Sequence, residues 1–400
     1  MKYRSINNIN FKNKKALIRV DYNVPLGSDL EILDDARVKS SIPTINKIIN
    51  DGGSCILISH MGRPTRKQES KFSLIKIKSL LENFLSKKVI FCDDCISNET
   101  IEKCYKSKAG DVILLENVRF YKEEKLGDKN FSKRLSRLGD VYVNDAFATA
   151  HRNHASNSVI SNFFSEKCIG YLMEKEIFNI NKILLNNSSP FTAILGGSKV
   201  SDKIELIEKL ISYVDNIIIG GAMSNTFIKA KGGNIGNSIY ENNKLEVAKK
   251  LIQKSIKNKV KLYFPEDCLA SKSINNRSET VIFNSGEIEN KWINVDLGPK
   301  SIKKFHQIIM DSEKILWNGP LGIYEIEKFS NGTNSIAHSI GNSTKNGAYS
   351  LVGGGDSISV ISKERLNENI SFISTGGGAM LNYIINEDLI AIKNIKSLSL

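Results

Sequence analysis

Short apolar runs alternate with longer amphipathic segments through the first half of the chain. The apolar runs predict β-strands over 16–20, 54–58, 89–91, 112–115 and 141–143. The amphipathic segments predict helices over 35–50, 73–86 and 130–137. This alternation indicates a parallel sheet with helices on both faces. In such sheets ligands bind beyond the carboxyl ends of the strands.

The second half repeats the pattern. Its apolar runs predict strands over 191–195, 217–219, 261–263, 281–283, 315–317, 349–352 and 371–373. A helix without glycine is predicted over 171–185 and would join the two halves. A chain of 400 residues is long enough for two domains, each with its own core. The sequence therefore predicts an α/β protein with two lobes.

In the first half, polar residues directly follow four of the predicted strands. They are Asp21, Asn23, His60, Arg63, Arg119 and Arg152, and Arg37 opens the first predicted helix. Any one of them has an ordinary interpretation as a solvated arginine or a structural histidine. Together at one sheet edge they favour a site for a small molecule with phosphate and carboxylate groups, which the planar guanidinium recognises.

In the second half, the strand ends are rich in glycine instead. The glycines are Gly220, Gly221, Gly319, Gly353, Gly354, Gly355, Gly376, Gly377 and Gly378. Glycine lets the backbone approach a ligand closely, which suits a nucleotide and its phosphates. One such turn, 195–203, follows a predicted strand and leads into a predicted helix, whose apolar face is formed by residues 200, 204, 207, 211 and 214. This interpretation places Lys199 and Lys203 in the first helical turn. The turn is either a phosphate site or an ordinary βα turn with two solvated lysines.

Standard nucleotide motifs are absent from the sequence. There is no GxxxxGK[ST], no GxGxxG followed by an acidic residue about twenty positions on, and no protein-kinase motif set. An arginine-rich half and a glycine-rich half are best explained by phosphoryl transfer between two substrates across a cleft.

Composition narrows the alternatives. The net charge is +13, but the basic residues are dispersed, which disfavours a nucleic-acid-binding protein. The six cysteines include a CxxC at Cys92 and Cys95 with Cys104 nearby, yet no second pair or histidine completes a zinc site. No apolar stretch predicts a membrane span or a signal peptide, so a reducing cytoplasm is expected.

The motifs, taken in order, resemble the phosphoglycerate kinase family over essentially the whole chain. They are RVDYNVP (19–25), SHMGRP (59–64), LLENVRF (114–120), NDAFATAHR (144–152), LGGSKVSDK (195–203), GGAMSNTF (220–227), WNGPLGIYE (317–325), GGGDS (353–357) and STGGGA (374–379). The resemblance implies two Rossmann-like lobes, each a parallel sheet flanked by helices, joined by a long helix with a cleft between them. It implies a first lobe of 1–170 plus 387–400, a connecting helix over 171–186 and a second lobe of 187–386.

The resemblance also implies site residues. For 3-phosphoglycerate they are Asp21, Tyr22, Asn23, Arg37, His60, Met61, Gly62, Arg63, Arg119 and Arg152. For ATP or ADP they are Lys199, Lys203, Glu325, Gly354, Gly355, Asp356 and Ser357, with Asp356 nearest to Mg²⁺. Charge in the transition state would be stabilised by Arg37, Lys203, Lys199, Gly376, Gly377 and Gly378.

The implied enzyme is a cytoplasmic monomer of glycolysis. It transfers a phosphoryl group in line between 1,3-bisphosphoglycerate and ADP, with lobe closure over its small-molecule substrates. A non-catalytic interaction module is the rival, and the presence of Arg37, Lys203 and Asp356 argues against it. The sequence departs from the family's usual residues at Met61, Tyr22 and Ala148, which replace Leu, Phe and Gly. It also departs at Ser357, at Met380, which is expected to crowd the following helix, and at the C-terminal end.

Overall fold

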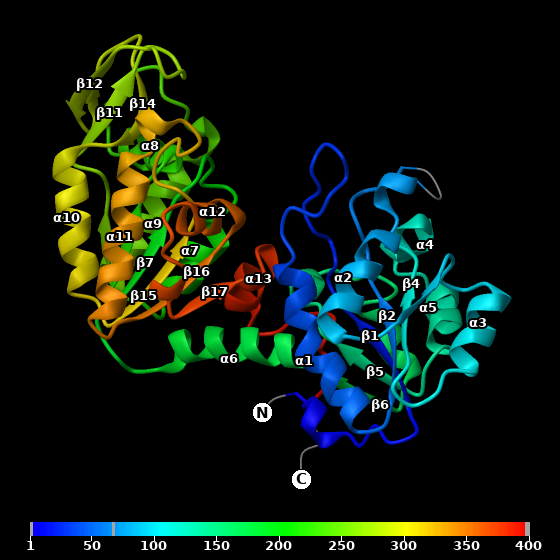
Figure 1. Ribbon diagram of the computed structural model, residues 1–400. Helices are drawn as coiled ribbons and strands as arrows, with labels where there is room; N and C mark the ends of the chain where they lie inside the picture. The colour runs from blue at the N-terminus through cyan, green and yellow to red at the C-terminus, as the bar shows by residue number, and fades with distance from the viewer. Residues whose placement is uncertain (1–2, 66–68, 397–400) are drawn as a thin grey trace. The chain divides into compact units, whose positions relative to one another are not determined.

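The computed structural model describes residues 3–65 and 69–396 of the chain, which is organised as two compact units (Figure 1). The first unit comprises Met1–Phe178 and Asn386–Leu400, and the second comprises Asn179–Ile385. The division falls inside helix α6 (Tyr171–Leu185), which therefore contributes residues to both units. The glycine-free segment predicted as a helix over 171–185 is confirmed as α6.

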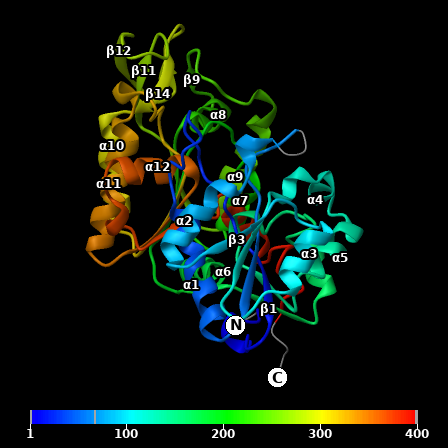
Figure 2. The same cartoon turned by 45° about the vertical axis from the view of Figure 1, so that its right-hand side comes forward.

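The first unit is built on a six-stranded parallel sheet in the order β3-β4-β2-β1-β5-β6. The strands are β1 (Lys15–Arg19), β2 (Ser54–Ile58), β3 (Val89–Cys92), β4 (Val112–Leu115), β5 (Val141–Asn144) and β6 (Glu166–Ile169). Helices α1 (Ala36–Asn50) and α2 (Ile75–Leu85) lie on one face, and α3 (Asn98–Tyr105), α4 (Lys122–Leu126) and α5 (Lys129–Ser136) on the other (Figures 1 and 2). Helices on both faces explain why the central strands are continuous apolar runs.

The C-terminal segment belongs to this first unit. Tyr3 and Lys396 form an isolated antiparallel bridge, and the Tyr3 hydroxyl donates a hydrogen bond to Asp388 Oδ1 at 2.8 Å. The Ala391 N–H donates to the carbonyl of Ala150 at 3.0 Å, close to the loop that carries Arg152. The last turns of the described chain therefore support the beginning of the chain and one of its strand-end loops.

The second unit contains another six-stranded parallel sheet, in the order β10-β8-β7-β15-β16-β17. Its strands are β7 (Phe191–Leu195), β8 (Asn216–Ile219), β10 (Lys261–Tyr263), β15 (Lys314–Asn318), β16 (Tyr349–Gly353) and β17 (Phe372–Ser374). The helices are α7 (Ile204–Leu210), α8 (Ala222–Ala230), α9 (Leu245–Lys257), α10 (Pro299–Met310), α11 (Asn331–Lys345), α12 (Gly355–Lys363) and α13 (Gly378–Asn386). Trp317, fully buried in β15, lies at the centre of the core that these elements share.

One part of the predicted sheet in this unit is wrong. The segment predicted as a strand over 281–283 is not in the parallel sheet but in β12 (Thr280–Asn284). It pairs antiparallel with β11 (Asp267–Ser271), which also pairs antiparallel with β14 (Ile293–Leu297). Figures 1 and 2 both show this small sheet at one end of the unit. An apolar run indicates a strand but does not say which partner it takes.

Two further features concern metal binding and membrane crossing. The described cysteines are all buried free thiols, and no group of three or more His, Cys, Asp or Glu side chains among residues 3–65 and 69–396 is arranged to hold a metal ion. Likewise, none of the helices in those residues combines the length and the apolar character that crossing a bilayer requires.

Candidate functional site

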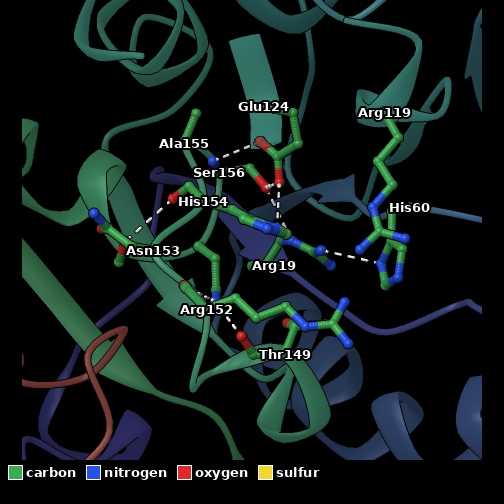
Figure 3. A network of polar contacts seen from close by, with 12 residues as sticks. Arg19, His60, Arg119, Glu124, Thr149, Arg152, Asn153, His154, Ala155 and Ser156 are labelled. Atoms are coloured by element: carbon green, nitrogen blue, oxygen red, sulfur yellow. Dashed lines mark hydrogen bonds and ion pairs between the residues drawn. The ribbon is translucent and has the colours of Figure 1, made fainter. Parts of the chain in front are cut away.

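The arginine-rich edge, defined as Asp21, Arg37, His60, Arg119 and Arg152, is formed at the carboxyl ends of four neighbouring strands. These strands are β4, β2, β1 and β5, which are adjacent in the sheet, and Arg37 is the second residue of α1. In the sequence β3 comes between β2 and β4, but in the sheet it lies at the margin. It therefore does not separate the four strand ends in space. Figure 3 shows His60, Arg119 and Arg152 gathered in one place together with Arg19.

Hydrogen bonds hold the side chains of this edge in place before any ligand binds. Arg37 Nη1 donates to Asp21 Oδ2 at 2.6 Å, and the Asp21 side chain is only 5% exposed. Asn23 Oδ1 accepts from the Gly62 N–H at 2.8 Å, and Arg119 Nη1 donates to the Gly62 carbonyl at 2.7 Å. Gly62 has a φ of +60°, and a Cβ there would lie 2.3 Å from Phe72, so the turn favours glycine.

The side chains of this edge are buried among positive charges, which lowers the pKa values of His60 and Arg119. Burial and the nearby Arg19 and Arg119 guanidinium groups hold the pKa of His60 well below its usual value, so the ring is neutral at pH 7. Burial, followed by repulsion from Arg152 and Arg19, lowers the pKa of Arg119 to about 10, which leaves it charged. An anion placed here would relieve the repulsion between the guanidinium groups.

Three residues implied by the resemblance differ in their surroundings. Tyr22 and Met61 are buried, and the Tyr22 hydroxyl lies 2.9 Å from Ser41 Oγ. The Asn117 side chain donates to the carbonyl of Met61 at 2.7 Å. Arg63 is exposed. The structure therefore gives Tyr22 and Met61 a packing role beneath the edge and leaves the Arg63 side chain accessible.

The glycine-rich edge, defined as the turns that follow β7, β15 and β16, surrounds a cavity of about 220 Å³. It is lined by Gly196, Gly197, Ser198, Lys199, Asp202, Lys203, Asn318, Gly319, Pro320, Gly354, Gly355, Asp356 and Ser357. Gly354 has a φ of +101°, which requires glycine in practice. The Gly319 N–H donates to Ser357 Oγ at 2.8 Å, so the hydroxyl at this position holds two of the turns together.

Lys203 is the central cation of this cavity. Burial lowers its pKa to about 8, although Asp202 and Asp356 oppose the shift. Its Nζ donates to the Asn318 carbonyl at 3.1 Å and also to the Asn318 side-chain oxygen. A mostly protonated, poorly solvated ammonium is well suited to stabilise charge on a phosphate.

The predicted placement of Lys199 and Lys203 in the first helical turn is wrong, because Lys203 is the N-cap residue that precedes the helix. Helix α7 begins at Ile204, and Lys199 lies in the preceding turn with its side chain exposed. Gly197 has a φ of +117°, and Glu241 accepts hydrogen bonds from the Ser201 N–H at 2.9 Å and from its hydroxyl at 2.7 Å. The apolar spacing that predicted a longer helix reflects burial of Val200 in the turn.

A second cavity, of about 290 Å³, is continuous with the first through the residues they share, Gly197, Ser198, Pro320 and Asp356. Its lining is largely apolar and includes Ile239, Ile274, Ile293, Val295, Leu321 and Ile323. Glu325, implied as a nucleotide ligand, lines this second cavity. An apolar slot beside a cation and open backbone turns suits a flat base next to phosphates.

Asp356 is the one implied metal ligand, and its setting fits Mg²⁺. Its exposed carboxylate faces both cavities, and Oδ1 accepts a hydrogen bond of 3.1 Å from the Tyr324 hydroxyl. Mg²⁺ in nucleotide sites takes one or two carboxylates and completes its shell with phosphates and water, so a single protein carboxylate suffices.

The structure does not bring the glycine turn after β17 into these cavities. Gly376, Gly377 and Gly378 follow β17, the neighbour of β16, but they line neither cavity. Met380, expected to crowd the helix that follows, is fully buried in α13 and packs beneath Gly353.

Sequence reasoning missed several residues that build the two edges. Arg19, Glu124 and Ser156 form a buried network behind His60, and Asn318 and Tyr324 orient Lys203 and Asp356. A charged residue inside an apolar strand, as Arg19 is, was the available signal, since buried charges are rare. Glu124 and Ser156 lie in segments that read as ordinary surface helix and loop.

Comparisons with known proteins agree with this geometry. The family model described as phosphoglycerate kinase matches residues 6–387. The phosphoglycerate kinase of Porphyromonas gingivalis is 43% identical over 417 residues, covering 98% of this chain and 100% of that protein. That of Chloroherpeton thalassium is 41% identical, covering 97% and 98%.

Solved structures give the same result. The structure of phosphoglycerate kinase from Coxiella burnetii has a TM-score of 0.89 at 36% identity, with 98% of both chains covered. That of the Pyrococcus horikoshii enzyme has a TM-score of 0.81 at 29% identity, also with 98% of both chains covered. The chain therefore belongs to the phosphoglycerate kinase family, whose members are kinases with a carboxyl group as phosphoryl acceptor.

Proposed function

We propose that the arginine-rich edge binds 3-phosphoglycerate or 1,3-bisphosphoglycerate and that the glycine-rich edge binds ATP or ADP with Mg²⁺. The observation that carries this division is the contrast between the edges. One presents the guanidinium groups of Arg37, Arg119 and Arg152 beside His60, and the other presents glycine turns and a half-buried lysine around a cavity. The first suits a small molecule with phosphate and carboxylate groups, and the second suits a polyphosphate attached to a base.

The reaction needs charge stabilisation rather than a general base. When 3-phosphoglycerate is the acceptor, its carboxylate is already ionised at pH 7 and attacks the terminal phosphoryl group directly. His60, held neutral by burial, donates a hydrogen bond and removes no proton. We assign stabilisation of the charge on the moving phosphoryl group to Arg37 and Lys203. Lys199 and the N–H groups of Gly376, Gly377 and Gly378 would assist them.

Asp356 would hold Mg²⁺ together with the nucleotide phosphates. When bound, the ion neutralises phosphate charge and helps to align the terminal phosphoryl group. Tyr324 keeps one carboxylate oxygen of Asp356 fixed by donating its hydroxyl proton. Ser357 contributes by joining two turns of the cavity through its hydrogen bond from Gly319.

A coupled assay tests the proposal. ATP consumption that depends on 3-phosphoglycerate is expected from the purified chain, and Lys203→Ala should lower turnover by about 10²–10³-fold, as for a lost oxyanion donor. Activity of the wild type no higher than that of Lys203→Ala would contradict the proposal. Tight duplex binding at physiological salt would instead favour a nucleic-acid role for the net charge of +13.

Water competes with the acceptor for the phosphoryl group, so we propose that the two units close over both substrates during turnover. Small-angle scattering should give a smaller radius of gyration with both ligands than with neither. An unchanged radius would contradict closure.

We further propose a cytoplasmic monomer. Six free, buried cysteines fit a reducing compartment. Sedimentation equilibrium with and without substrates should return the mass of one chain, and a dimer would contradict this assignment.

A further inference from the structure

A chain of buried hydrogen bonds runs behind the arginine-rich edge and ends on His60. Glu124 Oε1 accepts from the Ser156 hydroxyl at 2.8 Å, and that hydroxyl accepts from Arg19 Nε at 3.0 Å. At the other end of the guanidinium, Arg19 Nη2 lies 3.2 Å from His60 Nδ1. Figure 3 shows Arg19 between Ser156 and His60.

The chemistry of each group fixes the direction of every bond in this chain. A guanidinium has donors and no acceptor, so His60 Nδ1 is the acceptor in this bond and carries no proton; Asp21 Oδ1, the carboxylate oxygen that faces the same nitrogen, lies 3.8 Å away, beyond hydrogen-bond distance. In a neutral ring the single proton is then on Nε2. No group within residues 3–65 and 69–396 accepts a hydrogen bond from His60 Nε2, so this N–H remains available to an anion.

Burial makes the arrangement rigid. The exposed fractions are 0% for Glu124 and Ser156, 1% for Arg19 and 2% for His60. Glu124 also accepts from the Ser156 N–H at 2.8 Å, and its carbonyl accepts from the Ala155 N–H at 2.9 Å, in the loop that carries Arg152. A buried carboxylate with both oxygens bonded to one serine fixes that serine and, through it, Arg19.

We propose that Arg19 and Glu124, linked by Ser156, are positioning residues that hold His60 in the Nε2–H tautomer, with that N–H as the donor to the acceptor substrate. The proposal rests on the proposed function for the identity of the substrate, while the tautomer of His60 is a property of the substrate-free protein. Arg19 and Glu124 do not touch the substrate and act through His60.

The tautomer is measured directly by two-dimensional ¹H–¹⁵N NMR of the imidazole rings of the substrate-free protein, with His60→Gln used to assign the signal. A neutral ring protonated at Nε2 is expected. A ring protonated at Nδ1, or a mixture of tautomers, would overturn the proposal. Absence of kinase activity in the wild type would contradict the proposed function but leave this measurement intact.

Ser156→Ala breaks this series of hydrogen bonds without changing a charge. It should raise the KM for 3-phosphoglycerate by about 10-fold, the effect of losing one hydrogen bond to a charged group. The KM for ATP should stay within about twofold, and the His60 signal should change. Ser54→Ala is the matched control, because Ser54 is 3% exposed and opens β2 at the opposite end of the strand that leads to His60. Equal KM values for Ser156→Ala and Ser54→Ala would overturn the proposal.

A double-mutant cycle separates positioning from general stabilisation. If Ser156 acts through His60, Ser156→Ala should have no further effect on the KM for 3-phosphoglycerate in a His60→Gln background. Glu124→Gln breaks the series of hydrogen bonds at a second point, because the amide keeps only one acceptor oxygen for the two Ser156 donors. It should behave like Ser156→Ala in both backgrounds. Additive effects in the cycle would contradict a route through His60.

Discussion

The two units carry their proposed binding groups at the carboxyl edges of similar six-stranded parallel sheets, but the chemistry of these groups differs. The first unit presents guanidinium groups that the protein itself holds, Arg37 through the Asp21 carboxylate and Arg119 through the Gly62 carbonyl. The second presents backbone turns and Lys203, which is half-buried beside the amide of Asn318. The carboxyl edge of a sheet therefore determines where a ligand binds, and the residues after each strand determine which groups compensate the ligand's charge.

The difference has a consequence for stability. A buried carboxylate that loses its guanidinium partner is left uncompensated, so Arg37 should stabilise the fold through Asp21 as well as the proposed ligand. Lys203 has a lowered pKa because burial disfavours its charged form, so it supports the ligand at the expense of the fold.

The largest effect is expected on turnover. Arg37→Ala should lower kcat by about 10²–10³-fold, because the charge on the moving phosphoryl group loses a donor. It should also lower the free energy of unfolding by about 1–3 kcal/mol, because the buried Asp21 loses its partner. Steady-state kinetics and urea denaturation measure the two quantities.

Arg137→Ala is the control for Arg37→Ala, since Arg137 is exposed in the same unit and follows α5. It should change neither quantity by a measurable amount. If Arg37→Ala lost activity without losing stability, the pairing with Asp21 would not distinguish the first unit from the second.

Lys203→Met should show the opposite effect on stability. The folded pKa is about 8, below the ordinary value of 10.5, so the unfolded state binds more protons between these pH values. The variant should therefore be more stable than the wild type by about 1–3 kcal/mol below pH 8, net of the bond lost to Asn318. The advantage should shrink as the pH rises from 8 towards 10.5.

Urea denaturation of both proteins across this pH range measures the difference. A Lys203→Met variant that is less stable at pH 7 would show that the bonds to Asn318 outweigh burial of the charge. The lysine would then resemble the paired cations of the first unit, and the contrast would fail.

The sequence predicts both edges because strand alternation specifies which residues emerge at the carboxyl ends. Asp21, His60, Arg119 and Arg152 all follow strands that are adjacent in the sheet. The antiparallel sheet of β11, β12 and β14 escaped prediction because apolar runs do not encode their pairing. Ser156 escaped because its role depends on a contact with Glu124, which is 32 positions away.

The Lys199 prediction failed for a local reason. Spacing of apolar residues continues through a turn as readily as through a helix when the turn buries a side chain, as Val200 does. The left-handed backbone of Gly197 was the feature that decided the conformation, and glycine letters alone do not give a φ value.

A smaller effect is expected at Gly355, which opens α12 with no atom within 4 Å of a hypothetical Cβ. Gly355→Ala should leave stability unchanged or slightly higher, because alanine favours a helix. The added methyl group should obstruct a phosphate and raise the KM for ATP by about tenfold, the effect of weakening a hydrogen bond to a charged group. The KM for 3-phosphoglycerate should not change.

Gly341→Ala, inside α11 with ordinary contact distances of 3.4 Å and 3.5 Å, is the matched control and should leave both KM values as they are. A KM for ATP that stays constant in Gly355→Ala would show that the turn after β16 is not close to the phosphates. Backbone donors would then not be what distinguishes the second unit.

The smallest effect is expected at Tyr324, whose hydroxyl holds the Asp356 carboxylate at the glycine-rich edge by a hydrogen bond. Tyr324→Phe removes the 3.1 Å hydrogen bond to Asp356 and should weaken Mg²⁺-dependent ADP binding about threefold by calorimetry, because this exposed bond contributes little. Burial raises the pKa of Tyr324 to about 12, so the hydroxyl keeps its proton and the difference should stay constant from about pH 6 to pH 9. Tyr263→Phe in β10 is the control and should bind ADP as the wild type does. A tenfold or larger loss in Tyr324→Phe would mean that the second unit, too, depends on side-chain pairing to present its charge.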